Sequence, residues 1–247
     1  LSFTMLTTYN RGEEWNMYWL PALGYNVYDK FMLGMMFHNV SIPKNKFEYM
    51  LAPMYSFGQN TISGLVDMNY TWIPARNIRT IKLGLSGKTF GQGLGYADSD
   101  LVPNDNRYFV VQPYLDLMIG KPKEKKNYQQ NVLLKGHYIL EQNATASTYD
   151  SEITGASLSY RLDYKKRVHQ FSAAWRLDFL NVADEHPLIS ESSSLMNSGI
   201  ELDYSFEYWD RKDKSLNLRL FFGQNLFYNG VINDRYGFAL GGQSGSM

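Results

Sequence analysis

Apolar and polar residues alternate along most of this chain with a period of two. In residues 61–72, Val66 and Tyr70 belong to an apolar parity, whereas Asp67 and Asn69 belong to the opposite, polar parity. Successive side chains of a β-strand point to opposite faces of its sheet. The period therefore predicts a strand with one face that carries no charge and one face that accepts it.

The same alternation predicts twelve strands. They lie at residues 15–25, 30–40, 47–56, 61–72, 78–89, 107–119, 129–141, 153–164, 168–180, 196–209, 215–225 and 236–243. Many of the alternating runs are about 10 to 13 residues long, which is enough to cross a bilayer, whereas strands of globular proteins cluster near about 5 or 6. Length thus favours membrane strands over a soluble β-sandwich, which remains a third alternative. We predict an all-β fold, a transmembrane antiparallel up-and-down β-barrel of about 12 strands (about 12–14).

One domain accounts for this pattern. Residues 1–14 are predicted to be a linker or an extra strand, and residues 15–247 to be the outer-membrane β-barrel, with an incomplete C-terminal end left open. No low-complexity segment or domain-sized change in composition interrupts the strands. The chain has no Cys, which excludes disulfides and thiol chemistry.

The predicted connections alternate between short and long, as they do at the two ends of an outer-membrane barrel. The short set is 41–46, 73–77, 120–128, 165–167 and 210–215, and the other set contains the long 91–106, 142–152 and 181–195, with 57–60 as a short exception. This alternation predicts periplasmic turns on one side and outer loops on the other.

Charge separates along the same line. The short turns carry Lys44, Lys46, Arg76, Lys121, Lys123, Lys125, Lys126, Lys165, Lys166, Arg167, Arg211, Lys212 and Lys214 against three acidic residues. The long loops carry Asp98, Asp100, Asp105, Asp150, Glu152, Asp184, Glu185 and Glu191 and no Lys or Arg. The sorting predicts a two-sided molecule, in which weak Ca²⁺ or Mg²⁺ association would offset repulsion between the acidic loops and anionic glycolipid.

Each predicted face carries its own candidate residues. The residues expected to face lipid are Tyr70, Trp72, Tyr160, Trp175, Leu202 and Phe206. The residues expected to form a lumen network are Arg161, Asp163, Arg176, Asp178, Glu201, Asp203 and Arg219. Paired carboxylates can perform acid–base chemistry or bind a cation, but the arginines at the same parity favour a salt-bridged plug in a narrow barrel.

The four His of the chain form no recognisable catalytic or metal-binding motif, and no Ser–His–Asp arrangement is visible. His137 and His169 have no His or carboxylate at ligand spacing, which favours a structural role over a metal-binding one. No catalytic, cofactor-binding or metal-binding residue is therefore assigned. The basic residues lie in short turns without a platform of stacking aromatics, so nothing indicates nucleic-acid binding.

Two blocks near the ends of the chain resemble a known family. The first is 20–29 (LPALGYNVYD), followed by 32–34, 38–39, 51–58 and Gly64, and the second is 236–245 (YGFALGGQSG). They resemble the C-terminal barrel region of aminopeptidase-N-like (gluzincin) zinc metallopeptidases of Gram-negative bacteria, in which a peptidase domain precedes an outer-membrane barrel. The middle of the chain is generic barrel sequence, so the resemblance implies the fold more strongly than the activity.

The resemblance also implies a role and a location. The family's catalysis needs two His one helical turn apart with a Glu beside the first, and a downstream Glu, to hold Zn²⁺; this chain has no such motif. We therefore expect a non-enzymatic anchor in the bacterial outer membrane for a metallopeptidase-like domain absent from this chain, with Zn²⁺ only in that upstream domain. The expected partners are the lipid bilayer, outer-membrane glycolipid and, as candidates, other outer-membrane proteins.

The alternative function is an outer-membrane transport or secretion-associated channel. A channel would show a ring of one charge sign and small residues at mid-height. The lumen parity instead carries mixed charges and large residues such as Met50, Tyr114 and Phe221. A barrel of about twelve strands is narrow enough for such side chains to block, so the sequence favours the anchor.

Overall fold

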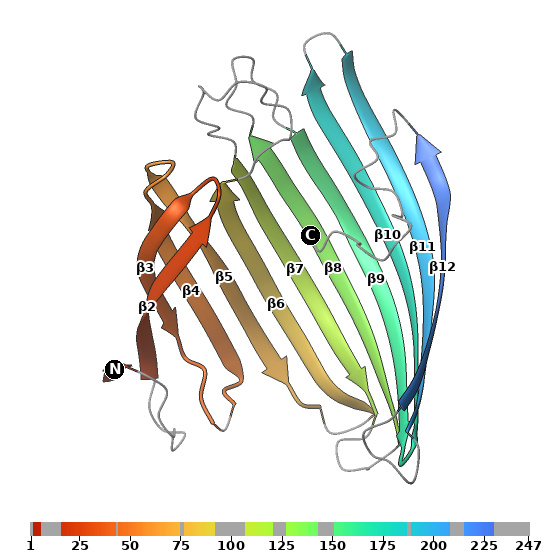
Figure 1. The fold of residues 1–247 in the computed structure, drawn as a ribbon. Helices are drawn as coiled ribbons and strands as arrows, with labels where there is room; N and C mark the ends of the chain where they lie inside the picture. Colours follow the sequence, from red (N-terminus) through yellow and green to blue (C-terminus); the bar gives the residue numbers. More distant parts are fainter. Residues whose placement is uncertain are drawn as a thin grey trace.

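The computed structural model describes residues 2–5, 16–42, 44–74, 77–91, 107–120, 127–142, 151–186, 189–207 and 215–229. These residues form a single β-sheet in which every strand lies beside its neighbours in the sequence (Figure 1). No helix among them is long and apolar enough to cross a membrane.

The sheet contains twelve strands, of which eleven form an antiparallel up-and-down series. The strands are β1 (Ser2–Met5), β2 (Asn16–Asn26), β3 (Lys30–His38), β4 (Phe47–Ser56), β5 (Thr61–Trp72), β6 (Ile78–Gly91), β7 (Arg107–Ile119), β8 (Tyr128–Gln142), β9 (Ser151–Lys166), β10 (His169–His186), β11 (Ile189–Glu207) and β12 (Ser215–Asn229). Strands β2 to β12 pair antiparallel in sequence order. The short β1 pairs parallel with β2, so residues 2–5 form an extra strand rather than only a linker.

Eleven predicted strands are confirmed. Nine lie within four residues of their predicted bounds, whereas β10 ends six residues later and β11 begins seven residues earlier than predicted. The predicted strand at 236–243 lies outside the described residues. The described strands form an open sheet, because no pairing joins β12 to β1 or β2. Figure 1 accordingly shows a curved wall with β2 and β12 at its two ends.

The prediction of a long loop at 181–195 is wrong. Strands β10 and β11 pair without interruption as far as His186 and Ile189, so the connection shrinks to two residues. The sequence does not reveal this extension because most of its residues are polar on both parities, with Asn181 opposite Ser194 on one and Asp184 opposite Glu191 on the other. Val182, which is buried, is an exception. Alternation of apolar and polar residues cannot mark a strand that has no apolar face.

The two ends of the strands form two edges of the sheet. The loop edge bears the β2–β3, β4–β5, β6–β7, β8–β9 and β10–β11 connections, and the basic edge bears the β3–β4, β5–β6, β7–β8, β9–β10 and β11–β12 turns. The acidic loops predicted from the sequence belong to the loop edge, although Asp184 and Glu191 lie in the β10–β11 hairpin instead of a loop.

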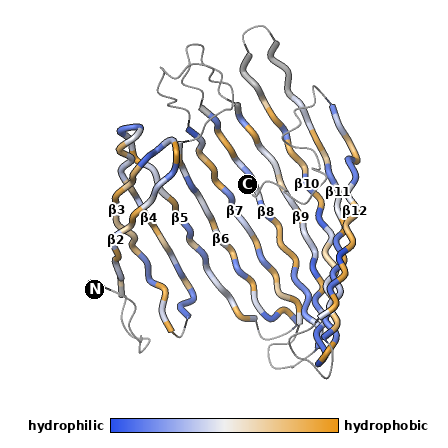
Figure 2. The backbone as a smooth tube through the Cα atoms, viewed as in Figure 1, coloured by the Kyte–Doolittle hydropathy of each residue, from blue (hydrophilic) through white to orange (hydrophobic). Residues whose placement is uncertain are grey.

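The two faces of the sheet differ sharply in exposure, as the alternation predicted. Every buried strand side chain in the described residues lies on one parity, here called the inner face, which includes Met54, Gln112 and Ser157. The large exposed hydrophobic side chains of the strands lie on the opposite parity, the outer face, with the exceptions of Phe221 and of Leu226 at a β-bulge. Figure 2 shows the resulting alternation of hydrophobic and hydrophilic positions along each strand.

A fully buried carboxylate holds the N-terminal strands onto the rest of the sheet. Asp29, in the turn between β2 and β3, is 0% exposed. Its Oδ2 accepts hydrogen bonds from Asn26 Nδ2 at 2.7 Å and from the backbone N of Gly91 at 2.7 Å. Its Oδ1 accepts one from Ser63 Oγ at 3.0 Å. The turn is therefore tied to the ends of β5 and β6 as well as to its own hairpin.

The backbone of Asp29 adds a second set of contacts with the β4–β5 turn. Its carbonyl oxygen accepts hydrogen bonds from Ser56 Oγ at 3.0 Å and from the backbone N of Gly58 at 2.9 Å. A Cβ added to Gly58 would lie 2.6 Å from the carbonyl oxygen of Tyr28, so only glycine permits this approach of the two turns. Burial raises the pKa of Asp29, but its hydrogen bonds to Asn26, Gly91, Ser56 and Ser63 outweigh burial and lower it below 3.8.

We expect Asp29→Asn to reduce the free energy of unfolding by about 2–4 kcal/mol, because the amide cannot accept all three hydrogen bonds and leaves a buried donor unpaired. A lowered folded-state pKa means that this stabilisation is complete above pH 3.8 and is lost as the pH falls below that value. Urea unfolding followed by tryptophan fluorescence, at neutral pH and at successively lower pH, measures both effects.

Asp163→Asn on the inner face is the matched control, since its side chain is 42% exposed and its loss should cost less than about 1 kcal/mol. Equal effects of the two substitutions, or a wild-type advantage that persists unchanged in strong acid, would contradict the role given to Asp29.

Candidate functional site

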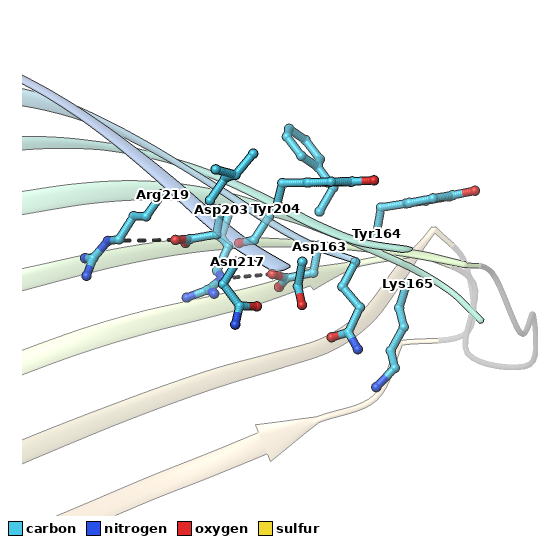
Figure 3. A pocket seen from close by; sticks show the side chains of 13 residues that line it. Asp163, Tyr164, Lys165, Asp203, Tyr204, Asn217 and Arg219 are labelled. Carbon is cyan, nitrogen blue, oxygen red and sulfur yellow. Dashed lines mark hydrogen bonds and ion pairs between the residues drawn. The ribbon is translucent and has the colours of Figure 1, made fainter. Parts of the chain in front are cut away.

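The charged residues predicted for a lumen network share the inner face of β9 to β12. Backbone register aligns Asp163 with Ser172, Ser172 with Asp203, and Asp203 with Arg219. An open groove of about 450 Å³ runs along this row near the basic edge, where Lys165 and Asn217 also line it. Figure 3 shows Asp163, Asp203, Asn217 and Arg219 gathered from three strands.

Two of the arginines pair with a carboxylate two residues away on the same strand. Arg161 Nε lies 3.0 Å from Asp163 Oδ1 on β9, and Arg176 Nε lies 2.7 Å from Asp178 Oδ2 on β10. Residues two apart on a strand share a face, so the strand geometry itself brings these partners together. Each pair is local to one strand.

The third arginine links two strands. Arg219 Nη2 on β12 lies 2.5 Å from Glu201 Oε1 on β11, and its Nε lies 3.8 Å from Asp203 Oδ1. The side chains of Arg161, Arg176 and Arg219 are 57%, 62% and 66% exposed. Exposed ion pairs are typically worth less than about 1 kcal/mol each.

The predicted network therefore exists as three local groups on one wall of the sheet. Parity predicted that the seven residues share one face, and the strand register places them on one face. The sequence also suggested that these residues form a plug across a pore. Their observed ion pairs instead join residues two positions apart on one strand or residues on adjacent strands. Parity identifies a common face but cannot specify which residues meet on it.

A buried hydrogen-bonded row crosses β7, β8 and β9 on the same face. Gln112 Nε2 lies 3.0 Å from His137 Nδ1, and His137 Nε2 lies 3.0 Å from Ser157 Oγ. Both ring nitrogens of His137 thus have partners, which fits the structural role predicted for it. No group of three or more His, Cys, Asp or Glu suited to hold a metal ion occurs among the described residues.

The Ser157–His137 contact has the spacing of a catalytic nucleophile and its general base. No sequence motif predicted this contact. Its third member is the amide of Gln112 rather than a carboxylate that would stabilise a protonated imidazole. Ser157 is only 9% exposed, which restricts access of a substrate to its hydroxyl. We read the row as a hydrogen-bonded belt that satisfies buried polar groups.

An apolar cluster on the inner face is the feature that sequence analysis missed. Val110, Ile139, Ile153 and Val182 are 1–6% exposed, and Tyr108 and Leu180 pack against them. They lie toward the loop edge of β7 to β10, where a polar lumen surface was expected. The signal was present in runs such as 109–111, which is apolar on both parities, but such runs do not reveal which face is buried.

The residues predicted to face lipid all lie on the outer face. Register aligns Tyr160, Trp175 and Ile200 in one row and Leu202 with Leu220 in the next. Tyr70 lies opposite Leu83, Trp72 opposite Ile81, and Phe206 opposite Leu216. His169, the other His considered as a ligand, is on this face as well, with its Nδ1 2.8 Å from the hydroxyl of Tyr204.

Comparison of the chain with protein family models, with curated proteins and with solved structures finds no match. The geometry offers a broad apolar outer face, an inner face that combines exposed ion pairs with buried apolar and polar clusters, and two edges of different chemistry.

We expect His137→Ala to destabilise the protein more than Arg161→Gln does. The first substitution leaves Gln112 and Ser157 buried without a partner, at a cost of about 2–3 kcal/mol, whereas the second removes an exposed ion pair worth less than about 1 kcal/mol. Urea unfolding of both variants under identical conditions gives the comparison. A larger loss for Arg161→Gln would mean that the ion pairs, not the buried row, hold this wall together.

Proposed function

We propose that the chain is an integral outer-membrane β-barrel that serves as a membrane anchor for a metallopeptidase-like domain. The exposed apolar outer face carries this proposal. Thirty-six large hydrophobic side chains are exposed in the described residues, most of them on this face. A contiguous patch of this extent is rare on soluble monomers and is typical of a surface that contacts lipid.

On β9 to β12 the outer face changes from apolar to polar between two neighbouring register rows. The row Ala156, Phe179, Met196 and Phe227 is apolar, and the next row toward the loop edge is Thr154, Asn181, Ser194 and Asn229. Ser194 Oγ donates a hydrogen bond to Asn181 Oδ1 at 3.2 Å within that polar row. Four neighbouring strands thus change from apolar to polar at the same register row, as expected where hydrocarbon gives way to water.

Toward the basic edge the apolar band contains a row of aromatic residues, with Phe206 and Leu216 one row beyond it. Tyr128, Tyr164, Phe171 and Tyr204 align there, eight residues below the upper row along β10. Eight steps span about 27 Å along a strand and about 20 Å along the membrane normal at a tilt of about 40–45°. With the side chains of both rows added, this approaches the band of about 25 Å and the aromatic girdle of membrane barrels.

Strand direction favours closure of the sheet into a barrel by one further strand. Strands β2 and β12 run in the same direction, because nine strands that alternate in direction lie between them. Direct pairing of the two would be parallel, whereas a single strand of opposite direction would pair antiparallel with β12 and with the part of β2 after Trp19, which β1 leaves free. The sequence segment 236–243 follows β12 and is the candidate for this strand. Open edges do not persist in lipid, because each unpaired backbone group costs several kcal/mol there.

The anchor is favoured over a channel by the contents of the inner face. Buried apolar side chains at the loop edge of β7 to β10 would interrupt a continuous water path. The association with a peptidase domain rests on the sequence resemblance of the end blocks. Zinc-dependent aminopeptidase activity that co-purifies with this chain from outer membranes, and is lost on chelation, would support that part of the proposal.

Membrane insertion predicts different tolerance of charge on the two faces. Leu202→Arg on the outer face should reduce the free energy of folding into lipid vesicles by about 2–4 kcal/mol. The control is Ser172→Arg on the inner face, next to Ala173, which pairs with Leu202. The new charge lies between Asp163 and Asp203, so this substitution should cost less than about 1 kcal/mol. Equal tolerance at the two positions in vesicle refolding would refute the lipid-facing assignment.

Planar-bilayer recording separates the anchor from the channel. The purified protein should insert without stable, large single-channel steps, because apolar and ion-paired side chains occupy the inner face. Reproducible steps whose conductance changes in Arg176→Gln or Glu201→Gln would reject the anchor in favour of a pore lined by these residues.

A further inference from the structure

The basic edge carries exposed lysines and exposed apolar side chains at two neighbouring connections, the β3–β4 and β5–β6 turns. Lys44 and Lys46 are exposed in the β3–β4 turn, and Lys46 O accepts a hydrogen bond from the backbone N of Thr71 at 2.6 Å. That contact extends the β4–β5 pairing, so Lys46 lies opposite Thr71 at the very end of the wall. The next two residues are Trp72, which is 60% exposed on the outer face, and Ile73, which is 66% exposed. We call Lys44, Lys46, Trp72 and Ile73 the rim site.

The turn that presents the two lysines is held by partly buried hydrogen bonds. Asn39, which is 7% exposed, donates from its Nδ2 to the carbonyl oxygen of Phe47 at 2.8 Å and accepts from the backbone N of Tyr49 at 2.7 Å. Asn45 Nδ2 donates to the carbonyl oxygen of Asn39 at 2.7 Å. The backbone that carries Lys44 and Lys46 is thus preorganised, which lowers the entropic cost of binding an anion.

Neither lysine forms an ion pair with a carboxylate of the described residues. The structure therefore leaves two cations at one level of the molecule without internal compensation. Lys165, Lys166 and Arg167 are exposed in the β9–β10 turn of the same edge, so the positive charge extends around the rim. Lys30, exposed at the opposite edge, belongs to the turn held by Asp29.

We propose that the rim site binds the phosphate group of an anionic phospholipid, with Lys44 and Lys46 on the phosphate and with Trp72 and Ile73 against the glycerol and upper acyl region. This inference rests on the proposed membrane insertion and names the lipid class that the basic edge selects. Lysine ammonium groups bind phosphate as point charges, and each basic residue near an anionic bilayer surface contributes to the attraction.

An amphipathic lipid fits this surface better than a soluble anion does. A free phosphate or a nucleic acid would use the lysines but leave Trp72 and Ile73 exposed to water. Tryptophan prefers the interface between headgroups and hydrocarbon, and Trp72 lies at the end of the apolar outer face, two residues beyond Tyr70. Both halves of the surface are matched only by a molecule that is charged at one end and apolar at the other.

Site-selective fluorescence quenching in vesicles tests the proposal. In one protein, Trp72 is kept and the other four tryptophans are changed to Phe; in the second, only Trp175, at mid-height of the outer face, is kept. Each is inserted into phosphatidylcholine–phosphatidylglycerol vesicles in which one lipid or the other carries brominated acyl chains at the same mole fraction. Brominated phosphatidylglycerol should quench Trp72 more than brominated phosphatidylcholine does, and Trp175 should respond equally to both.

The lysines must be responsible for the selectivity. Each lysine engaged should raise the relative association constant of the anionic lipid at Trp72 about fivefold. Lys44→Gln with Lys46→Gln should remove the difference at Trp72, as should high salt, whereas Lys30→Gln at the opposite edge should leave it unchanged. Free inorganic phosphate at the same bulk concentration should not compete if the lipid itself is bound.

The outcomes separate this inference from the proposed function. Failure of every brominated lipid to quench Trp175 overturns membrane insertion and the rim site with it. Normal quenching of Trp175 with equal quenching of Trp72 by the two lipids overturns only the rim site. Selectivity that survives the double lysine substitution, or that free phosphate abolishes, also overturns lipid binding by these lysines.

Discussion

Antiparallel pairing of β2 to β12 is the constraint on which the other features of this protein depend. Pairing fixes the face of every residue, because side chains alternate along each strand and paired residues share a face. It also aligns residues from distant parts of the chain into rows. The apolar outer rows, the polar row next to them and the contacts of the inner face all follow from the register of these pairs, which shifts at the β-bulge between Met196 and Asn197. The His137–Ser157 contact is diagonal, because His137 lies opposite Gly155.

The inner face is divided between two kinds of stabilisation. Exposed arginine–carboxylate pairs on β9 to β12 contribute little individually, whereas the buried contacts of Asp29 and His137 are costly to lose because their partners have no water to replace them. Asp29 is the longest of these connections, since it joins the first hairpin to Gly91 across 62 residues. Its position at the loop edge also fixes where β6 ends and the following connection begins.

The outer face and the two edges describe one consistent environment. Apolar side chains end at a polar row on the loop side and at aromatic residues on the basic side, so the exposed surface has the layered order of a bilayer. In a bilayer, the proposed rim site would continue this order from the aromatic row to the lipid phosphates. A soluble sheet with such a face would be prone to association, which is why lipid is the occupant that we propose.

The sequence by itself determined the strands, their faces and the two-sided distribution of charge, because alternation and turn residues are local properties. It could not determine which side chains meet. Arg219 pairs with Glu201, and His137 with Gln112 and Ser157, only because adjacent strands pair in one register among several that local patterns allow. The β10–β11 extension and the inner apolar cluster were not predicted for a related reason. Where both parities are mostly polar or both are apolar, the alternation gives no information, and only the tertiary structure decides which residues form strands and which face is buried.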